Sequence, residues 1–225
     1  MSVEKKLGAL RVLGAYTWTK SIDNASNYND EPINPFNSRI SRSLSSFDMT
    51  HNFVASYTYE LPVARRMANG LTRSVLGGWQ LSGITRVTTG LPITLTASGD
   101  LSLVGSNGID RPNYNGAAIQ ILDPRASSNH LYFAKTPFSA ETLGVAGNAN
   151  RRFFHGPGLR NFDLSLVKAT KIKERINTEL RVEFFNVFNH AQFTNPAGNF
   201  TAANFGTITS ARDPRIGQVA LKVHF

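Results

Sequence analysis

The sequence predicts an all-β fold: a portion of an antiparallel transmembrane β-barrel with about six strands. Apolar and polar side chains alternate along six segments, so each predicted strand has one apolar and one polar face. Long connections alternate with shorter ones, as in barrels that have long outer loops and short inner turns. No run of about 18 apolar residues occurs, which excludes a membrane-spanning helix.

The composition excludes several classes of protein. With 41% hydrophobic and 17% charged residues, the 225-residue chain is too apolar to be disordered. It has no cysteine, which excludes disulfides, thiolate metal sites and cysteine nucleophiles. Its 24 Lys and Arg against 15 Asp and Glu give a net charge of +9, which suits nucleic acid, an anionic membrane surface or a basic channel wall. Charge alone does not choose among them.

The first three predicted strands are residues 9–20, 52–61 and 79–95. Residues 1–15 are taken as the interior of a strand, because the alternation runs on through Trp18; a degenerate export signal is the alternative, and Arg11 interrupts its apolar part. The apolar members are Leu10, Val12, Tyr16 and Trp18, then Phe53, Ala55, Tyr57, Tyr59 and Leu61, then Trp79, Leu81, Val87, Leu91 and Ile93.

The last three predicted strands are residues 161–171, 177–188 and 216–225. The first two are joined by a short charged link and should form a hairpin. The last strand has the clearest alternation of the chain. Its apolar face carries Val219, Leu221, Val223 and Phe225, and its polar face carries Gln218, Ala220, Lys222 and His224.

The connections set the direction of the strands. Soluble domains seldom contain loops beyond about 12 to 15 residues, so residues 21–48, 96–158 and 194–215 favour a barrel. If the last strand runs inward, all three lie outside the cell, and residues 96–158 are the first choice for a lid or ligand contact. Aromatic side chains agree with this direction, with Trp18 near the outer interface and Tyr59, Trp79 and Phe225 near the inner one. The predicted interface aromatics are Tyr16, Trp18, Tyr57, Tyr59 and Trp79.

Charged side chains on one parity predict a polar interior wall. Asp163, Glu179, Arg181, Glu183 and Lys222 should form a ladder of charges on neighbouring strands that fixes register, with direct substrate contact as the alternative. On the lipid side each charge would cost up to about 2 to 4 kcal/mol at mid-depth. Their parity therefore indicates which face lines the lumen.

No constellation for catalysis, metal or cofactor binding is expected. Ser165 and Lys168 match S-x-x-K, but positions three apart on a strand point to opposite faces. The five histidines have no metal-ligand spacing. Nucleic acid is not an expected partner, because the aromatic residues fall on the apolar parity. We therefore expect no enzymatic activity.

A sheet in lipid must close, and six strands are fewer than the roughly 8 of the smallest outer-membrane barrels. Residues 1–225 are therefore expected to be the carboxy-terminal part of a larger barrel. The alternative is a soluble β-sandwich that serves as a binding or adhesion module, with the same apolar parity facing a shared core.

Six stretches together resemble the carboxy-terminal barrel half of TonB-dependent outer-membrane receptors of the Oar-like type. The resemblance implies a bacterial outer-membrane receptor with a barrel of about 22 strands and an amino-terminal plug. It implies that substrate binds from outside, that outer-membrane lipid surrounds the chain, and that the TonB complex acts only through an amino-terminal part outside these residues. It also implies that Val219, Leu221, Val223 and Phe225 form the signal read by the barrel-assembly machinery. The stretches are YTWTKSIDN (16–24), FDMTHNFVASYTYELP (47–62), GGWQLSGITRVTTGLP (77–92), GPGLRNFDLSLVK (156–168), LRVEFFNVFNHAQF (180–193) and RDPRIGQVALKVHF (212–225).

Overall fold

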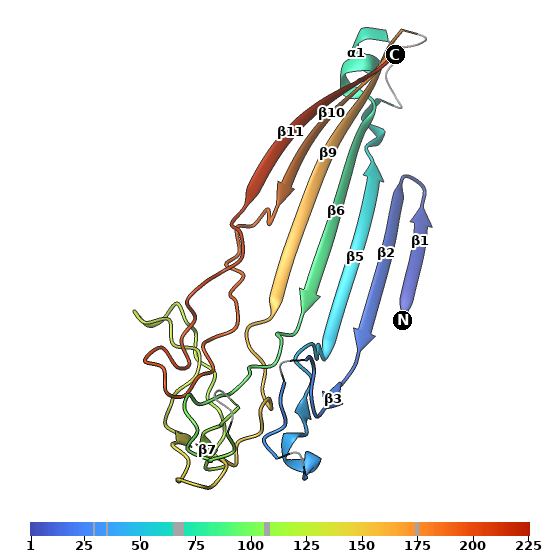
Figure 1. Ribbon diagram of the computed structural model, residues 1–225. Helices are drawn as coiled ribbons and strands as arrows, with labels where there is room; N and C mark the ends of the chain where they lie inside the picture. Colours follow the sequence, from blue (N-terminus) through green and yellow to red (C-terminus); the bar gives the residue numbers. More distant parts are fainter. Residues whose placement is uncertain (29, 35, 65–69, 106–108, 174–175) are drawn as a thin grey trace.

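A single seven-stranded antiparallel sheet forms the body of the protein (Figure 1). The computed structural model describes residues 1–28, 30–34, 36–64, 70–105, 109–173 and 176–225. In the order in which they lie, the strands are β1 (Ser2–Leu7), β2 (Leu10–Trp18), β5 (His51–Glu60), β6 (Trp79–Thr88), β9 (Leu159–Lys173), β10 (Ile176–Phe185) and β11 (Ile216–His224). All neighbours pair antiparallel, which confirms the predicted fold class.

The remaining elements are short. Two small ladders pair β3 (Ile22–Asp23) with β4 (Ser43–Leu44), and β7 (Asn113–Tyr114) with β8 (Phe138–Ser139). The helical segments are η1 (Ser38–Ser41), η2 (Pro62–Ala64) and α1 (Gly70–Leu76). No helix in the described part of the chain is long and apolar enough to cross a membrane.

The start of the chain differs from the prediction of one continuous strand. It folds into a hairpin, with Leu7 paired to Leu10 and a two-residue turn at Gly8 and Ala9. Gly8 has φ +58°, and a glycine with positive φ at the first turn position is typical of a type II′ hairpin. The prediction of six strands was therefore one too few.

The strand predicted over residues 79–95 ends earlier, at Thr88. Beyond it the chain leaves the sheet at Gly90, where a Cβ would lie 1.9 Å from the carbonyl oxygen of Gly156. Ile93 and Leu95 are then almost completely buried in a separate apolar core. Their alternation continues the strand pattern, but they serve a different core.

The register places like side chains in rows across the whole sheet. A polar row and the apolar row beside it each cross all seven strands, so the parity predicted strand by strand stays in phase. Lys5 is an exception, since it lies in register with Val12 on the apolar face of the edge strand. The polar row is Lys6, Arg11, Thr58, Ser82, Ser165, Glu183 and Gln218, and the apolar row is Leu7, Leu10, Tyr59, Leu81, Leu166, Val182 and Val219.

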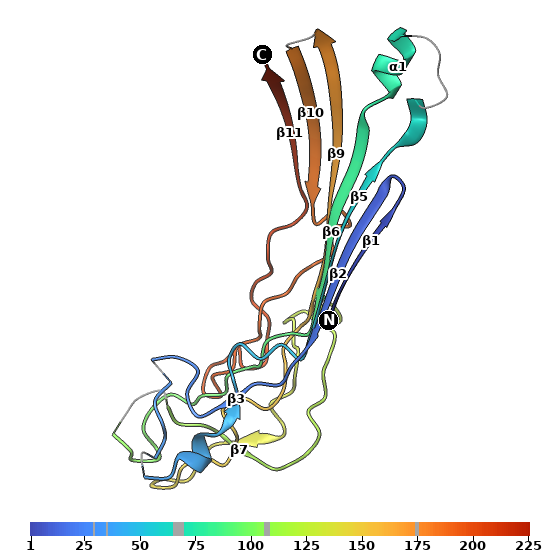
Figure 2. The ribbon, with the colours of Figure 1, turned by 90° about the vertical axis from the view of Figure 1, so that its right-hand side faces the viewer.

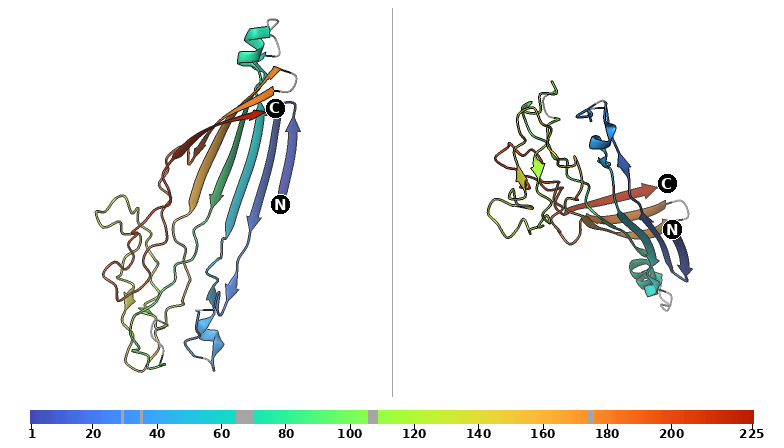
Figure 3. Two further views of the ribbon diagram at one scale, coloured as in Figure 1. Left: turned by 45° about the horizontal axis from the view of Figure 1, so that its top comes forward. Right: turned by 90° about the horizontal axis from the view of Figure 1, so that it is seen from below.

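The sheet is one curved layer, seen edge on in Figure 2. Strands β9 to β11 turn toward the side on which the loops gather, and α1 lies on the opposite, convex side (Figures 2 and 3). Trp79 and Lys168 belong to the apolar parity and bond to carbonyl groups of residues 74–77, so that parity faces the convex side. No second sheet packs on the apolar face in the described residues, so the β-sandwich alternative was wrong.

The core of the protein lies outside the sheet, in a loop body formed by residues 19–50, 89–158 and 186–215. All three long connections run to the same end of the sheet, as the predicted direction requires (Figure 1). Phe133 is fully buried at its centre and makes edge-to-face contacts with Phe138, Phe154 and Phe205. The core residues are Ile93, Leu95, Tyr132, Phe133, Phe138, Ala149, Phe200, Phe205 and Ile208.

Candidate functional site

Aromatic side chains mark both ends of the apolar face. Trp18 is the last residue of β2 and is 72% exposed, and Tyr16 lies one outward-facing position deeper, where its hydroxyl bonds His51 at 2.7 Å. Tyr59 and Trp79 lie at the other end of the sheet, on adjacent strands. Tyr57 lies deeper than Tyr59, and its ring covers Gly83, where an added Cβ would come within 2.5 Å of the ring.

Basic side chains also bound the apolar face. Arg160 and Lys168 lie eight residues apart on β9 and share the apolar parity with Phe162, Leu164 and Leu166 between them. At about 3.3 Å per residue the two are about 26 Å apart along the strand, or about 20 Å in depth at a tilt of about 40°. This separation is close to the roughly 25 Å apolar band of outer-membrane barrels.

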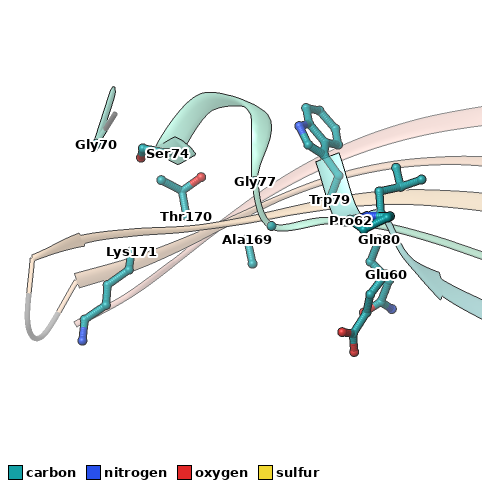
Figure 4. Close-up of a pocket in the computed structure, with 12 residues that line it drawn as sticks. Glu60, Pro62, Gly70, Ser74, Gly77, Trp79, Gln80, Ala169, Thr170 and Lys171 are labelled. Carbon is teal, nitrogen blue, oxygen red and sulfur yellow. The ribbon is translucent and has the colours of Figure 1, made fainter. Parts of the chain in front are cut away.

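Lys168 ties the inner end of the sheet to α1. Its Nζ donates to the carbonyl oxygens of Ser74 (2.7 Å) and Gly77 and lies 5.5 Å from the centroid of the Trp79 ring. A cavity of about 600 Å³ lies beside this contact (Figure 4). There the Trp79 ring points to one side of the sheet, whereas Glu60 and Lys171 point to the other. The cavity brings no reactive pair of groups together.

The predicted charge ladder is centred on one strand. Arg181 Nη2 lies 2.8 Å from Glu179 Oε1, and Arg181 Nη1 lies 3.5 Å from Glu183 Oε1. Lys222 is in register with Glu179, but the structure gives no ion pair between them. Asp163 instead accepts the backbone N–H of Asn186 at 2.9 Å, where β10 ends. All five side chains share the concave face, and the two half-buried ion pairs contribute about 0 to 1 kcal/mol each.

The predicted assembly signal lies on the edge strand β11. Val219, Leu221, Val223 and Phe225 are 70%, 68%, 49% and 98% exposed. Their strand pairs with β10 on one side only, and β1 is likewise unpaired on its outer side. A strand with one open edge and an uncovered apolar face is able to add to another sheet through main-chain hydrogen bonds.

The loop body is tied together by buried charges. Asp30 bonds to Arg151 (3.2 Å) and Arg152 (2.9 Å), which joins the first long loop to the second. Burial acts to raise the pKa of Asp30, but the Ser26 N–H and both arginines hold it below its usual value. Arg111 is 2% exposed, and burial together with the two neighbouring arginines lowers its pKa to about 10.

A histidine–carboxylate pair also joins the first long loop to the second. His155 Nε2 is 2.9 Å from Asp48 Oδ2, and the Asp48 side chain is fully buried. Burial acts to raise the pKa of Asp48, but the Ser21 N–H and His155 lower it overall. Both residues line a cavity of about 560 Å³, together with the exposed cations Lys20 and Arg42 and the buried Arg152. Its polar wall is mainly cationic, so it suits an anionic group.

Two carboxyl groups meet inside the longest loop. Asp110 is fully buried and accepts hydrogen bonds from the hydroxyl and N–H of Ser102. Burial and the contact with Asp110 raise the pKa of Glu141 to about 7. The described residues contain no cluster of three or more potential metal ligands. Ser165 and Lys168 lie on opposite faces of the sheet, where Ser165 bonds to Glu183 and Lys168 to the Ser74 carbonyl oxygen.

The loop-body residues were missed by the sequence reasoning. Asp30, Arg151 and Arg152 have no helical or strand period around them, and they meet only through contacts between residues more than 100 positions apart. The adjacent arginines beside Phe153 and Phe154 were the available signal, because charged residues within an aromatic stretch need buried partners. Arg160 lies inside a quoted motif, but only the register shows that it faces outward.

Comparisons with known proteins agree with this geometry. A family model described as "Outer membrane beta barrel domain" matches residues 1–218. No curated protein and no solved structure gives a significant match. The match covers almost the whole chain and includes all strands of the sheet up to the first part of β11. The chain therefore belongs to the outer membrane β-barrel domain family, and its place is the bacterial outer membrane.

Proposed function

We propose that this chain forms the carboxy-terminal wall and outer loop body of a TonB-dependent receptor of the Oar-like type. The loop body binds a substrate outside the cell, and the complete barrel carries it across the outer membrane. The TonB complex acts through an amino-terminal part. The chain performs no chemistry of its own and needs no cofactor.

One observation carries the proposal: the second and third long loops share an apolar core, and the ion pairs of Asp30 tie the first loop to it, so that the three form a single body on the concave side of the sheet. A pore with freely mobile loops would need no such core. Loops held rigidly on a barrel are well suited to carry binding groups, because little conformational entropy is lost when a ligand binds. The cationic cavity of about 560 Å³ lies inside this body.

The open sheet supports a larger barrel. Both β1 and β11 have an unpaired edge, and unpaired backbone groups are not tolerated in hydrocarbon. More strands must therefore complete the wall. The six quoted stretches favour a receptor rather than a simple pore, because they cover strands and the adjoining loop segments in the family's order.

The test has two parts, both on the full-length protein. Single cysteines at Ala118 in the loop body and at Val63 beyond β5 report sidedness in a cysteine-free full-length background; residues 1–225 contain no cysteine to remove. A membrane-impermeant maleimide should label Ala118→Cys on intact cells and should label Val63→Cys only after lysis. The reverse pattern would contradict the orientation.

The second part addresses TonB. Titration of the periplasmic domain of TonB into the full-length protein, purified from outer membranes, should give saturable one-to-one binding. Absence of binding, with the barrel folded by its heat-modifiable migration, would contradict the receptor proposal and leave the barrel assignment standing.

A further inference from the structure

A groove of about 810 Å³ lies where the loop body meets the apolar face of the sheet. Its floor comes from an outward-facing row close to the loops: Tyr16, Phe53 and Val87 on three adjacent strands. Its walls come from residues 123–125, 155–158 and 190–193 of the loop body. The groove therefore opens on the lipid side of the sheet rather than on the lumen.

The depth of the groove is fixed by the register. Tyr16, Phe53, Val87 and Arg160 form one row, and each lies one or two residues from the loop end of its strand. At about 3.3 Å per residue, this row is within about 7 Å of the strand ends. The rows below it carry no charged side chain on β2, β5, β6 and β9 until Lys168, so the groove lies at the level of the outer-leaflet headgroups.

Two arginines, Arg125 and Arg160, outnumber the single carboxylate among the described lining of the groove. Arg160 belongs to its sheet row, and Arg125 reaches over the Phe193 ring, with 5.5 Å from its Cζ to the ring centroid. Both arginines are exposed, and neither forms an ion pair within the described ranges. Asp123 is the one acidic residue among the groove's described lining, and its Oδ1 accepts the backbone N–H of Arg125. His51 adds a further polar group at the floor, beside Tyr16.

An arginine on a lipid-facing row is costly unless an anion meets it there. The other outward-facing cation of the same strand, Lys168, has its partners in the carbonyl groups at the end of α1. Arg160 lacks such a partner in the described chain. Guanidinium groups bind phosphate oxygens in bidentate fashion, and a headgroup phosphate is the anion found at this depth.

We propose that this groove binds the phosphate-bearing headgroup of an outer-leaflet lipid. Arg125 and Arg160 pair with the phosphate, and Tyr16, Phe53 and Val87 contact the first part of the acyl chains. The site is separate from the substrate pathway, because it opens on the opposite side of the wall. It depends on the orientation of the sheet and not on TonB.

The test uses the full-length protein purified from outer membranes in detergent, with bound lipid counted by native mass spectrometry. The probes are diphosphorylated lipid A, the same lipid with its phosphates removed, and inorganic phosphate. The protein should retain the phosphorylated lipid and bind the dephosphorylated lipid about tenfold or more less tightly, through loss of charge-assisted hydrogen bonds.

Arg125→Gln and Arg160→Gln should each weaken retention about tenfold. Arg86→Gln is the matched control, because Arg86 lies at the same end of the sheet on the concave face, in register with Asn161. Equal retention by the arginine variants and the parent would overturn the proposal, as would equal binding of the dephosphorylated lipid. Competition by millimolar inorganic phosphate alone would show a free-anion site and would also overturn it. The lipid comparison needs only the parent protein, so it decides the matter even if a variant fails to fold.

Discussion

Replacing Leu164 by arginine tests whether the convex face of the sheet lies against hydrocarbon. Leu164 is four residues from both Arg160 and Lys168 on β9, in register with Gly83 and Phe184. It lies about 13 Å along the strand from either cation, close to the middle of the band. The neighbouring Ser165 faces the concave side, where its hydroxyl bonds Glu183 at 3.2 Å.

The expected cost follows from this depth. A lipid-facing arginine near the midplane costs about 2 to 4 kcal/mol, which is roughly a 30- to 900-fold shift in the folding equilibrium. Ser165→Arg adds the same charge one residue away, but it places the charge beside the Glu183 carboxylate. We expect that control to change stability by less than about 1 kcal/mol, within the range of cross-strand charge pairs.

The assay is reversible urea unfolding of the full-length protein in phospholipid bilayers, followed by tryptophan fluorescence and by heat-modifiable migration. The difference in unfolding free energy between Leu164→Arg and Ser165→Arg is the quantity of interest. Equal losses, or a larger loss for Ser165→Arg, would refute the assignment of the two faces.

Three further predictions concern the loop body and the last strand. Phe133→Ala should lower the stability of the loop body alone by about 3 to 5 kcal/mol. Proteolysis of the loop body on intact cells should become faster while the barrel keeps its heat resistance. Loss of heat resistance together with faster proteolysis would contradict a separate core. The pKa of Glu141 is raised from an ordinary 4.5 to about 7 in the folded body, so the folded body binds the proton more tightly and loses stability as pH rises between these values. Protection factors of the loop amides, corrected for the intrinsic rise of exchange with pH, should therefore fall from pH 5 to pH 7.5 in the parent but not in Glu141→Gln, and a parallel fall in the variant would argue against the carboxyl pair. Deleting Phe225 should lower insertion into the outer membrane, measured by the folded fraction in outer-membrane preparations; unchanged insertion would remove its role in assembly.

The spanning part of the fold could be predicted because lipid imposes a simple rule on it. Every strand has hydrocarbon on one side, so a period of two is visible in the sequence, and the loop lengths give the direction. The prediction went wrong where the period continued but the environment changed. Ile93 and Leu95 keep the alternation of β6 while packing into the loop body. The hairpin at Gly8 was missed because the change of parity between Leu7 and Leu10, which are three positions apart, was not taken as the sign of a turn.

The loop body could not be predicted from local pattern. Its core aromatics come from irregular segments with no period, and Phe133 meets Phe205 across 72 positions of sequence (205 − 133). The lipid-side groove was missed for a related reason. Arg160 reads as an ordinary polar residue before a strand, and it is the pairing with Val87 that places it on the outward face.

The bonds from Asp30 to Arg151 and Arg152 have a consequence for biogenesis. Between these residues the chain forms β5 and β6. Their contact therefore requires that both strands first cross the membrane and pair with their neighbours. Such distant closures are slow, because the entropy of a large loop must be lost before any contact compensates it. We therefore expect the loop body to fold after the strands, so that a barrel with incompletely inserted strands exposes it unfolded to extracellular proteases.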